Sequence, residues 1–127
     1  MPLSKQEWLA LEKKAFDLRK LTVQTTVWAG SGHFGGGMSV MDMLAILYYK
    51  YMKYDVANPQ WEDRDRLVLS KGHTAPALYA ALAEKGFFSK DELKNLRQVG
   101  SFLQGHPDMK GTPGVDMTTG SLGLGVS

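Results

Sequence analysis

One segment of this 127-residue chain has the pattern of a β-strand, and this limits the possible folds more than any other feature. Arg66–Ser70 is short, apolar at its centre, and bounded by charged residues and glycine. A lone strand cannot satisfy its own backbone hydrogen bonds, so this segment needs partner strands that the sequence does not supply. We therefore expect a helix-rich portion of a larger fold.

The first helix is predicted from its start signal. Ser4 and Glu7 have the spacing of a capping box, in which each side chain bonds the other residue's free backbone amide. Apolar residues then recur at three- and four-residue spacing, which predicts one buried stripe made of Trp8, Leu11, Ala15 and Leu18. From residue 22 to 28, β-branched residues lower the helix propensity. The local sequence leaves open whether the helix continues there or a strand begins.

The middle of the chain holds a glycine-rich run, Gly30–Gly37, and then an apolar segment. Glycine loses much conformational freedom inside a helix, so the run predicts irregular structure. Ser39, with Asp42 three residues later, predicts the N-cap of a second helix. Residues 40–52 are apolar on nearly all faces of that helix, which indicates that it is buried.

The second half begins with a helix signal and ends in a predicted loop. Pro76 lies in the first turn of a helix that Gly86 ends, and Ser89 with Glu92 forms another capping box. Residues 100–127 are rich in Gly, Pro and Thr and finish on a glycine-rich turn. Such a turn normally precedes a helix, so we expect residues 1–127 to form a partial domain that is truncated at its C-terminal end.

The composition argues against several classes of protein. The formal charge is +2, and no basic stripe with interleaved aromatic residues appears, so nucleic-acid binding is not expected. The longest apolar stretch, Met43–Tyr49, is far shorter than the ~20 residues that cross a bilayer. Cysteine is absent, which removes disulfides and thiolate metal sites and favours a reducing compartment such as the cytoplasm.

All three histidines directly follow a glycine: His33, His73 and His106. Glycine lets the backbone turn sharply and leaves the next side chain room to face a pocket. From spacing alone, three interpretations remain open: ordinary polar turns, a zinc site, or a shared catalytic site. None of the spacings resembles the close pairing that is typical of zinc ligands.

The terminal glycines permit more than one interpretation. Gly120, Gly123 and Gly125 superficially resemble a dinucleotide-binding motif, but the order is wrong and no acidic residue follows. The run fits better as a tight loop that offers backbone amides to an anion, or as a close packing turn.

Four motifs in this order resemble the transketolase family: Ser31–His33, Asp65–His73, Gly105–Asp108 and Pro113–Gly123. The resemblance covers the chain from about Lys14 onward and is greatest to enzymes whose two halves are separate chains. It implies an α/β fold that binds thiamine diphosphate, of which this chain holds the helix-rich N-terminal portion with the parallel sheet incomplete.

The resemblance also implies a reaction and partners. Members of the family transfer a two-carbon ketol unit from a ketose phosphate to an aldose phosphate, in the pentose phosphate pathway, with thiamine diphosphate and Mg²⁺ as cofactors. The chain is then expected in a homodimer, or in a heterotetramer with a C-terminal pyrimidine-binding subunit. Sugar phosphates would be its substrates.

Matching the motifs residue by residue assigns roles to six positions. The resemblance implies that His33 contacts the substrate near the scissile bond, that His106 bonds the hydroxyl of the ketol fragment, and that His73 bonds the cofactor diphosphate. Gly120, Ser121 and Leu122 correspond to the loop that packs against the cofactor. An imidazole can give or accept a proton near neutral pH, which suits a carbonyl addition. A purely structural role stays open for His106, as loop support, and for Leu122, as core packing.

The sequence also departs from the family pattern. Phe34 stands where much of the family has proline, and Leu124 stands where glutamine is usual. The Gly-Asp-Gly and distant Asn that clamp the metal and diphosphate do not occur, so the Mg²⁺ ligands are expected outside this chain. We predict that the chain alone binds the cofactor weakly and does not turn over. A 1-deoxyxylulose-5-phosphate synthase-like enzyme and a non-catalytic association domain are the alternatives.

Overall fold

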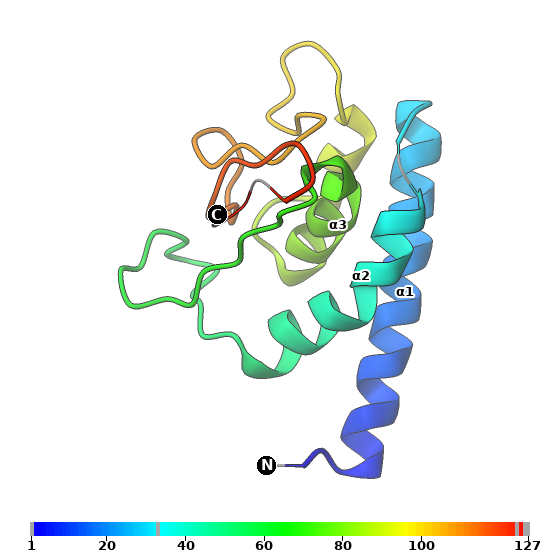
Figure 1. The fold of residues 1–127 in the computed structure, drawn as a ribbon, viewed down its shortest axis with the longest axis vertical. Coiled ribbons are helices and arrows are strands. Elements are labelled where there is room, and N and C mark those ends of the chain that lie inside the picture. Colours follow the sequence, from blue (N-terminus) through cyan, green and yellow to red (C-terminus); the bar gives the residue numbers. More distant parts are fainter. Residues whose placement is uncertain (1, 33, 124, 126–127) are drawn as a thin grey trace.

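The computed structural model describes residues 2–32, 34–123 and 125. Three helices form its centre: α1 (Lys5–Ala29), α2 (Phe34–Ile46) and α3 (Ala75–Lys85). A π-helical turn, η1 (Leu47–Tyr51), extends α2, and two 3-10 turns, η2 (Gly72–Thr74) and η3 (Lys90–Asn95), flank α3. The three α-helices pack against one another. The long helix α1 runs along one side of the molecule, and the loops of the second half lie on the side of α3 away from α1 (Figure 1).

Helix α1 begins at the predicted capping box. The Ser4 hydroxyl accepts from the Glu7 backbone N–H at 3.2 Å, and the Glu7 carboxylate accepts from the Ser4 N–H at 3.0 Å. The helix then continues to Ala29, which settles the question that the β-branched residues left open. Thr22, Thr25 and Thr26 are buried, and each hydroxyl donates to the carbonyl four residues earlier, so the helix itself satisfies these polar groups.

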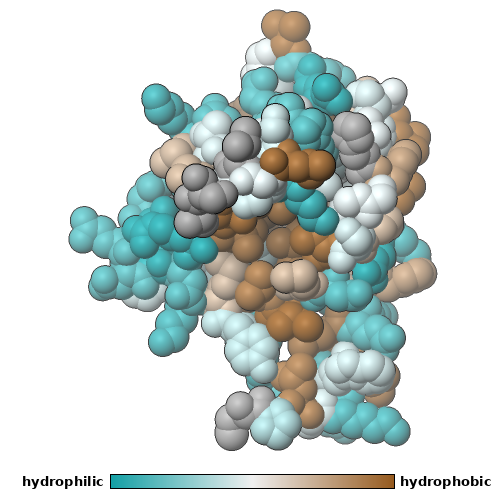
Figure 2. Space-filling view, viewed as in Figure 1, coloured by the Kyte–Doolittle hydropathy of each residue, from teal (hydrophilic) through white to brown (hydrophobic). Residues whose placement is uncertain are grey.

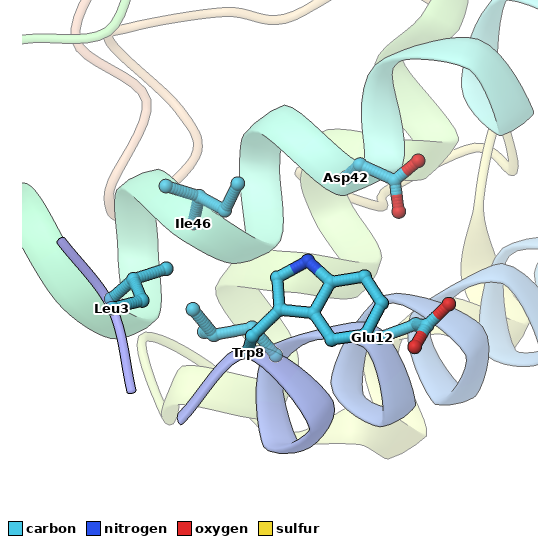
Figure 3. Close-up of a pocket in the computed structure, with 6 residues that line it drawn as sticks. Leu3, Trp8, Glu12, Asp42 and Ile46 are labelled. Atoms are coloured by element: carbon cyan, nitrogen blue, oxygen red, sulfur yellow. The ribbon is translucent and has the colours of Figure 1, made fainter. Parts of the chain in front are cut away.

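The predicted stripe on α1 is only partly buried. Ala15 and Leu18 are each 1% exposed, as expected, but the Trp8 side chain is 54% exposed, and that prediction is wrong. Trp8 and Leu11 lie where α1 diverges from α2, and they line a surface groove there instead of entering the core (Figure 3). The groove has carboxylates of Glu12 and Asp42 at its edge.

Helix α2 starts earlier than predicted, inside the glycine-rich run. Ser39 does not cap it; its hydroxyl donates to the Gly36 carbonyl within the helix at 3.0 Å. Neighbouring segments lie close against two of these glycines, Gly36 and Gly37. A Cβ on Gly36 would overlap the Thr74 methyl, and one on Gly37 would touch Ala77 and Thr22. Close packing therefore outweighs the poor helix propensity of glycine.

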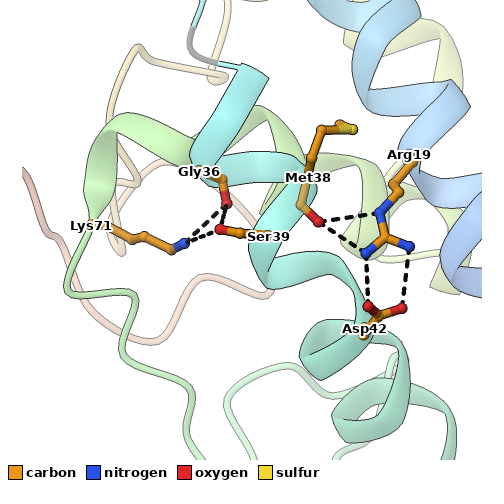
Figure 4. A network of polar contacts seen from close by, with 6 residues as sticks. All are labelled: Arg19, Gly36, Met38, Ser39, Asp42 and Lys71. Carbon is orange, nitrogen blue, oxygen red and sulfur yellow. Dashed lines mark hydrogen bonds and ion pairs between the residues drawn. The ribbon is translucent and has the colours of Figure 1, made fainter.

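Polar contacts fasten α2 to its neighbours (Figure 4). The Arg19 guanidinium donates to both carboxylate oxygens of Asp42, at 3.1 and 2.8 Å, and to the Met38 carbonyl. These bonds hold the pKa of Asp42 below its ordinary value. On the other side, Lys71 Nζ donates to the Gly36 carbonyl at 3.0 Å and to the Ser39 hydroxyl at 3.1 Å. The loop before η2 is thus tied to the start of α2.

Helix α3 is the buried centre of the molecule. Pro76 lies in its first turn and Gly86 ends it in the left-handed conformation, both as predicted. Every residue from Ala75 to Ala83 is buried, so the helix is covered on all sides over this stretch. Its burial places the preceding turn, η2, firmly against the core.

The strand prediction for residues 66–70 is wrong for this structure. No strand occurs in residues 2–32, 34–123 and 125, so this segment has no sheet to join. The Leu67 N–H donates to the Asp116 carboxylate at 2.8 Å, and the Ser70 carbonyl accepts from the Gly123 N–H at 2.8 Å.

Hydrophobic side chains gather in the middle of the face that Figure 2 shows, with hydrophilic side chains around them.

Residues 100–123 are loop, as expected. The second predicted capping box does not form: the Ser89 hydroxyl accepts from the Asp91 N–H, and a short 3-10 turn follows. Leu93 and Leu96 are buried, whereas Val99 is fully exposed. No helix in the described part of the chain is long and apolar enough to cross a membrane.

Candidate functional site

Two of the three predicted histidines meet in the structure. His73 lies in η2 at the start of the buried helix α3, and His106 lies in the loop that crosses the same end of that helix. Their ring centroids are 4.8 Å apart and the rings stand edge to face at 85°. His33 lies outside the residues that the structure describes, so its predicted place in the site stays a prediction.

The two imidazoles line a small cavity of about 60 Å³. Ligand pockets that hold a whole cofactor have volumes of roughly 300–1,000 Å³, so this cavity takes only a small polar fragment of a larger ligand. The described lining residues come from four segments that are far apart in the sequence: Ser31, Gly32, His73, Pro76, Leu96, Arg97, Gly105 and His106. Residues of three of the four family-like motifs therefore line this cavity: the Ser31–His33, Asp65–His73 and Gly105–Asp108 motifs each contribute at least one.

The fourth motif, the glycine turn, packs against the second. A Cβ on Gly72 would lie 2.8 Å from the N and Cα atoms of Gly120, so the absence of a side chain at Gly72 permits this backbone contact. Gly120 is half-buried, while Ser121 and Leu122 are exposed. Leu122 is 74% exposed, which excludes core packing as its role within the described structure. The turn therefore lies beside His73 with two side chains facing outward.

Among the described residues, a buried hydroxyl at the glycine turn lacks a hydrogen-bond partner. Thr119, next to Gly120, is 6% exposed, and its backbone N–H donates to the Pro107 carbonyl at 3.3 Å. Its hydroxyl oxygen makes no hydrogen bond within the described part of the chain. Buried polar groups are nearly always paired, so this hydroxyl marks a position where a ligand or water belongs.

The Tyr79 hydroxyl anchors the loop that contains His106. Its hydroxyl donates to the Gln104 carbonyl at 2.7 Å and to the His106 carbonyl at 3.1 Å. Burial raises the pKa of Tyr79 well above its ordinary value, so the phenol stays protonated and remains a donor. The fully buried helix α3 thus fixes both histidines, His73 through its N-terminal turn and His106 through this side chain.

The donors present fit the organic cofactor that the resemblance implies, but not its metal. Two imidazoles, a closely packed glycine turn and an unpartnered buried hydroxyl lie together, and these groups can bond phosphate and hydroxyl oxygens. No group of three or more His, Cys, Asp or Glu side chains that would hold a metal ion occurs among the described residues. A metal would need ligands beyond these residues.

Sequence reasoning did not assign Arg97, Tyr79 or Thr119 to the site. No local pattern marks Tyr79, in an apolar helical run, or Arg97, in a loop between Leu96 and Gln98. These two reach the site only through contacts of the folded chain. Thr119 lies inside the Pro113–Gly123 motif, but the local signals, a glycine before each histidine and the glycine turn itself, did not single it out.

Comparison with known proteins gives one answer. Residues 11–127 match the family described as transketolase, thiamine diphosphate binding domain. The 6-deoxy-6-sulfo-D-fructose transketolase subunit SqwG of Clostridium sp. (strain MSTE9) is 51% identical over 96% of this chain and 44% of its own length. The human transketolase is 45% identical over 95% of this chain and 19% of its own length. The chain thus spans less than half the length of these relatives.

Solved structures agree with the sequence relatives. Transketolase from Leishmania mexicana superposes with a TM-score of 0.86 and 43% identity, over 91% of this chain and 17% of that one. Transketolase from Campylobacter jejuni superposes with a TM-score of 0.84 and 38% identity, over 99% of this chain and 19% of that one. The expected fold class is confirmed: the chain has the helix-rich part of an α/β fold.

All three comparisons concern transketolases. They are the family match over residues 11–127, the relatives at 45–51% identity and the superposed structures. The chain belongs to the transketolase family and corresponds to the thiamine diphosphate binding domain at its N-terminal end.

Proposed function

We propose that this chain serves the transfer of a two-carbon ketol unit from a ketose phosphate to an aldose phosphate, with thiamine diphosphate as cofactor. The observation that supports this most is the pairing of His73 and His106 over one cavity beside the glycine turn. Imidazoles that face a shared polar cavity suit a reaction in which protons move on and off sugar oxygens.

Each residue has a distinct role in this proposal. When bound, thiamine diphosphate supplies the carbanion chemistry. His73 donates a hydrogen bond to its diphosphate, and Gly120, Ser121 and Leu122 pack against it. His106 bonds the hydroxyl of the ketol fragment, accepts the proton when that oxygen becomes a carbonyl oxygen, and returns a proton in the reverse direction. His33 contacts the substrate near the bond that breaks.

The proposed function also requires a partner for this chain. One relative is named a subunit, and we propose that this chain likewise works with a partner that carries the pyrimidine-binding half, as a homodimer or heterotetramer. We also propose that Mg²⁺ neutralises the diphosphate through ligands other than the described residues, and that the assembly acts in the cytoplasm on sugar phosphates.

The ketose donor can carry a phosphate or a sulfonate group, and the two can be compared directly. The relative at 51% identity is named for a sulfonated fructose, whereas others, such as the human protein, are named transketolase only. Phosphate and sulfonate are both tetrahedral anions at the end of a ketose. Parallel assays with the phosphorylated and the sulfonated donor decide which of the two the complete assembly uses.

Activity measurements on the complete assembly test the proposal. We expect ketol transfer from a ketose phosphate to an aldose phosphate that depends on thiamine diphosphate, and no carboligation when pyruvate replaces the ketose. Since general acid-base groups contribute roughly 10²–10⁴-fold, His106→Ala should lower kcat/KM by about 10²-fold or more. Lys110→Ala, in the exposed loop that follows, is the matched control and should leave it unchanged. A donor preference for pyruvate would refute the proposal.

A further inference from the structure

Arg97 has an unusual backbone conformation for its residue type. Its φ of 64° is in the left-handed region, and no other non-glycine residue in the described ranges has a positive φ. An L residue is disfavoured there because its Cβ crowds the backbone. The conformation is fixed by the Arg97 N–H, which donates to the Leu103 carbonyl at 2.9 Å. Strained conformations of this kind persist where the surroundings impose them, and they cluster at functional sites.

The Arg97 side chain touches two loops of the site at once. Nη1 donates to the Ser31 hydroxyl at 3.3 Å, across 66 positions of sequence. Its guanidinium also lies against Gly105, where an added Cβ would be 3.2 Å from Nε and 3.4 Å from Cζ. Gly105 precedes His106, so one side chain connects the Ser31–Gly32 loop with the loop of His106.

The charge of this guanidinium is not neutralised by a carboxylate. No ion pair joins Arg97 to an acidic side chain within the described part of the chain, although Arg19 and Arg64 each have one. No described residue that lines the cavity is acidic. An arginine that served only to stabilise the fold would not need a strained backbone, a hydroxyl partner and a place beside two imidazoles.

We propose that Arg97 is a positioning residue that holds the Ser31–Gly32 loop and the Gly105–His106 loop in the relative placement that ketol transfer needs. This inference rests on the proposed function. It acts through its neighbours, because the planar guanidinium bonds one loop and lies against the other. Lysine cannot reproduce both contacts, since its ammonium is a point charge on a flexible stem.

Substituting Arg97 by glycine separates positioning from stability. Glycine adopts a φ of 64° without strain, so the melting temperature of Arg97→Gly in the complete assembly should stay the same or rise. Catalysis should fall, because a small misplacement of reacting groups costs on the order of 10²-fold in rate. Arg97→Lys should also lose about tenfold or more in kcat/KM, whereas Lys110→Ala should lose nothing.

Hydrogen exchange of backbone amides gives a readout that does not depend on activity. Arg97→Gly, and separately Ser31→Ala, should increase exchange at residues 30–32 in the complete assembly, and Arg97→Gly should also increase it at residues 104–106. Lys110→Ala should change neither loop. Unchanged exchange at both loops in Arg97→Gly, or a uniform increase with a lower melting temperature, would overturn the proposal. If the wild-type assembly shows no ketol transfer but the loops loosen as expected, the proposed function fails and the positioning role stands.

Discussion

At the scale of single residues, a largely buried ion pair joins the residue before the Asp65–His73 motif to Asp116 in the Pro113–Gly123 motif. Arg64 Nε lies 2.9 Å from Asp116 Oδ1, and the two side chains are 9% and 8% exposed. The other carboxylate oxygen of Asp116 accepts the Leu67 N–H. Both oxygens of one buried carboxylate are therefore used to hold the segment that leads to His73 against the segment that leads to the glycine turn.

Breaking this pair should be costly. Asp116→Asn leaves the buried Arg64 charge without its counter-ion, and such a change destabilises proteins by about 3–5 kcal/mol. We expect a loss of this size in the free energy of urea unfolding. Asp17→Asn breaks the exposed Lys13–Asp17 pair on α1 and is the matched control, with an expected loss below about 0.5 kcal/mol. Equal losses for the two variants would show that the Arg64–Asp116 pair is not effectively buried.

The histidines were predictable from sequence, and their supporting residues were not. A glycine before each histidine is a local signal, and His73 and His106 do face one cavity. Arg97 and Tyr79 carry no such signal because their contacts join segments that are far apart: Arg97 bonds Ser31, and Tyr79 bonds the loop 25–27 residues later. Contacts between distant segments depend on the completed packing, which spacing along the chain does not encode.

At the scale of secondary-structure elements, helix ends followed local rules and helix interiors did not. The capping box at Ser4 and the helix end at Gly86 depend only on neighbouring residues, and both predictions are confirmed. The glycine-rich start of α2 was predicted to be irregular and the prediction is wrong. The contact of Gly36 with Thr74 leaves no room for a Cβ at that position.

Two adjacent glycines of α2 give a matched test of this explanation. A Cβ on Gly35 meets nothing within 4 Å, whereas one on Gly36 overlaps the buried Thr74 side chain. Gly35→Ala should therefore stabilise the fold by up to about 1 kcal/mol through helix propensity. Gly36→Ala should destabilise it by about 1–3 kcal/mol through overpacking, despite the same gain in propensity. Thermal unfolding of the two variants checks this, and stabilisation by both would contradict close packing at Gly36.

The contact between the start of α1 and η1 should depend on acidity. A hydrogen bond from Lys50 is the main cause that lowers the pKa of Glu7 from 4.5 to about 2. Because the folded-state pKa is depressed, the stabilisation is complete above about pH 4.5 and is lost as the pH falls through about 2. The melting-temperature difference between wild type and Glu7→Gln should therefore shrink over this range.

Glu12→Gln, on the exposed side of the same helix, is the control for the loss of a negative charge on α1. Its difference from wild type should not show the same decline between pH 4.5 and 2. A Glu7→Gln difference that stays constant down to pH 2 would mean that the pair with Lys50 does not form in solution.

At the scale of the whole molecule, three packed helices present loops at one end, and the loops build the site. Helix α3 is buried from Ala75 to Ala83, and both histidines are anchored to it. The strand-like sequence at residues 66–70 instead forms an extended connection that bonds Asp116 and Gly123. A strand needs neighbouring strands, and none occurs among the described residues, so a strand-like pattern gives a wrong prediction here.

Cofactor binding by the complete assembly tests most directly whether these loops form the diphosphate side of a thiamine diphosphate site. In a calorimetric titration with thiamine diphosphate and Mg²⁺, His73→Ala should bind about tenfold or more weakly than wild type, since it loses a hydrogen bond to a charged group worth roughly 1.5–3 kcal/mol. Lys110→Ala should bind with wild-type affinity. Equal affinities for His73→Ala and wild type would contradict the assignment of this site.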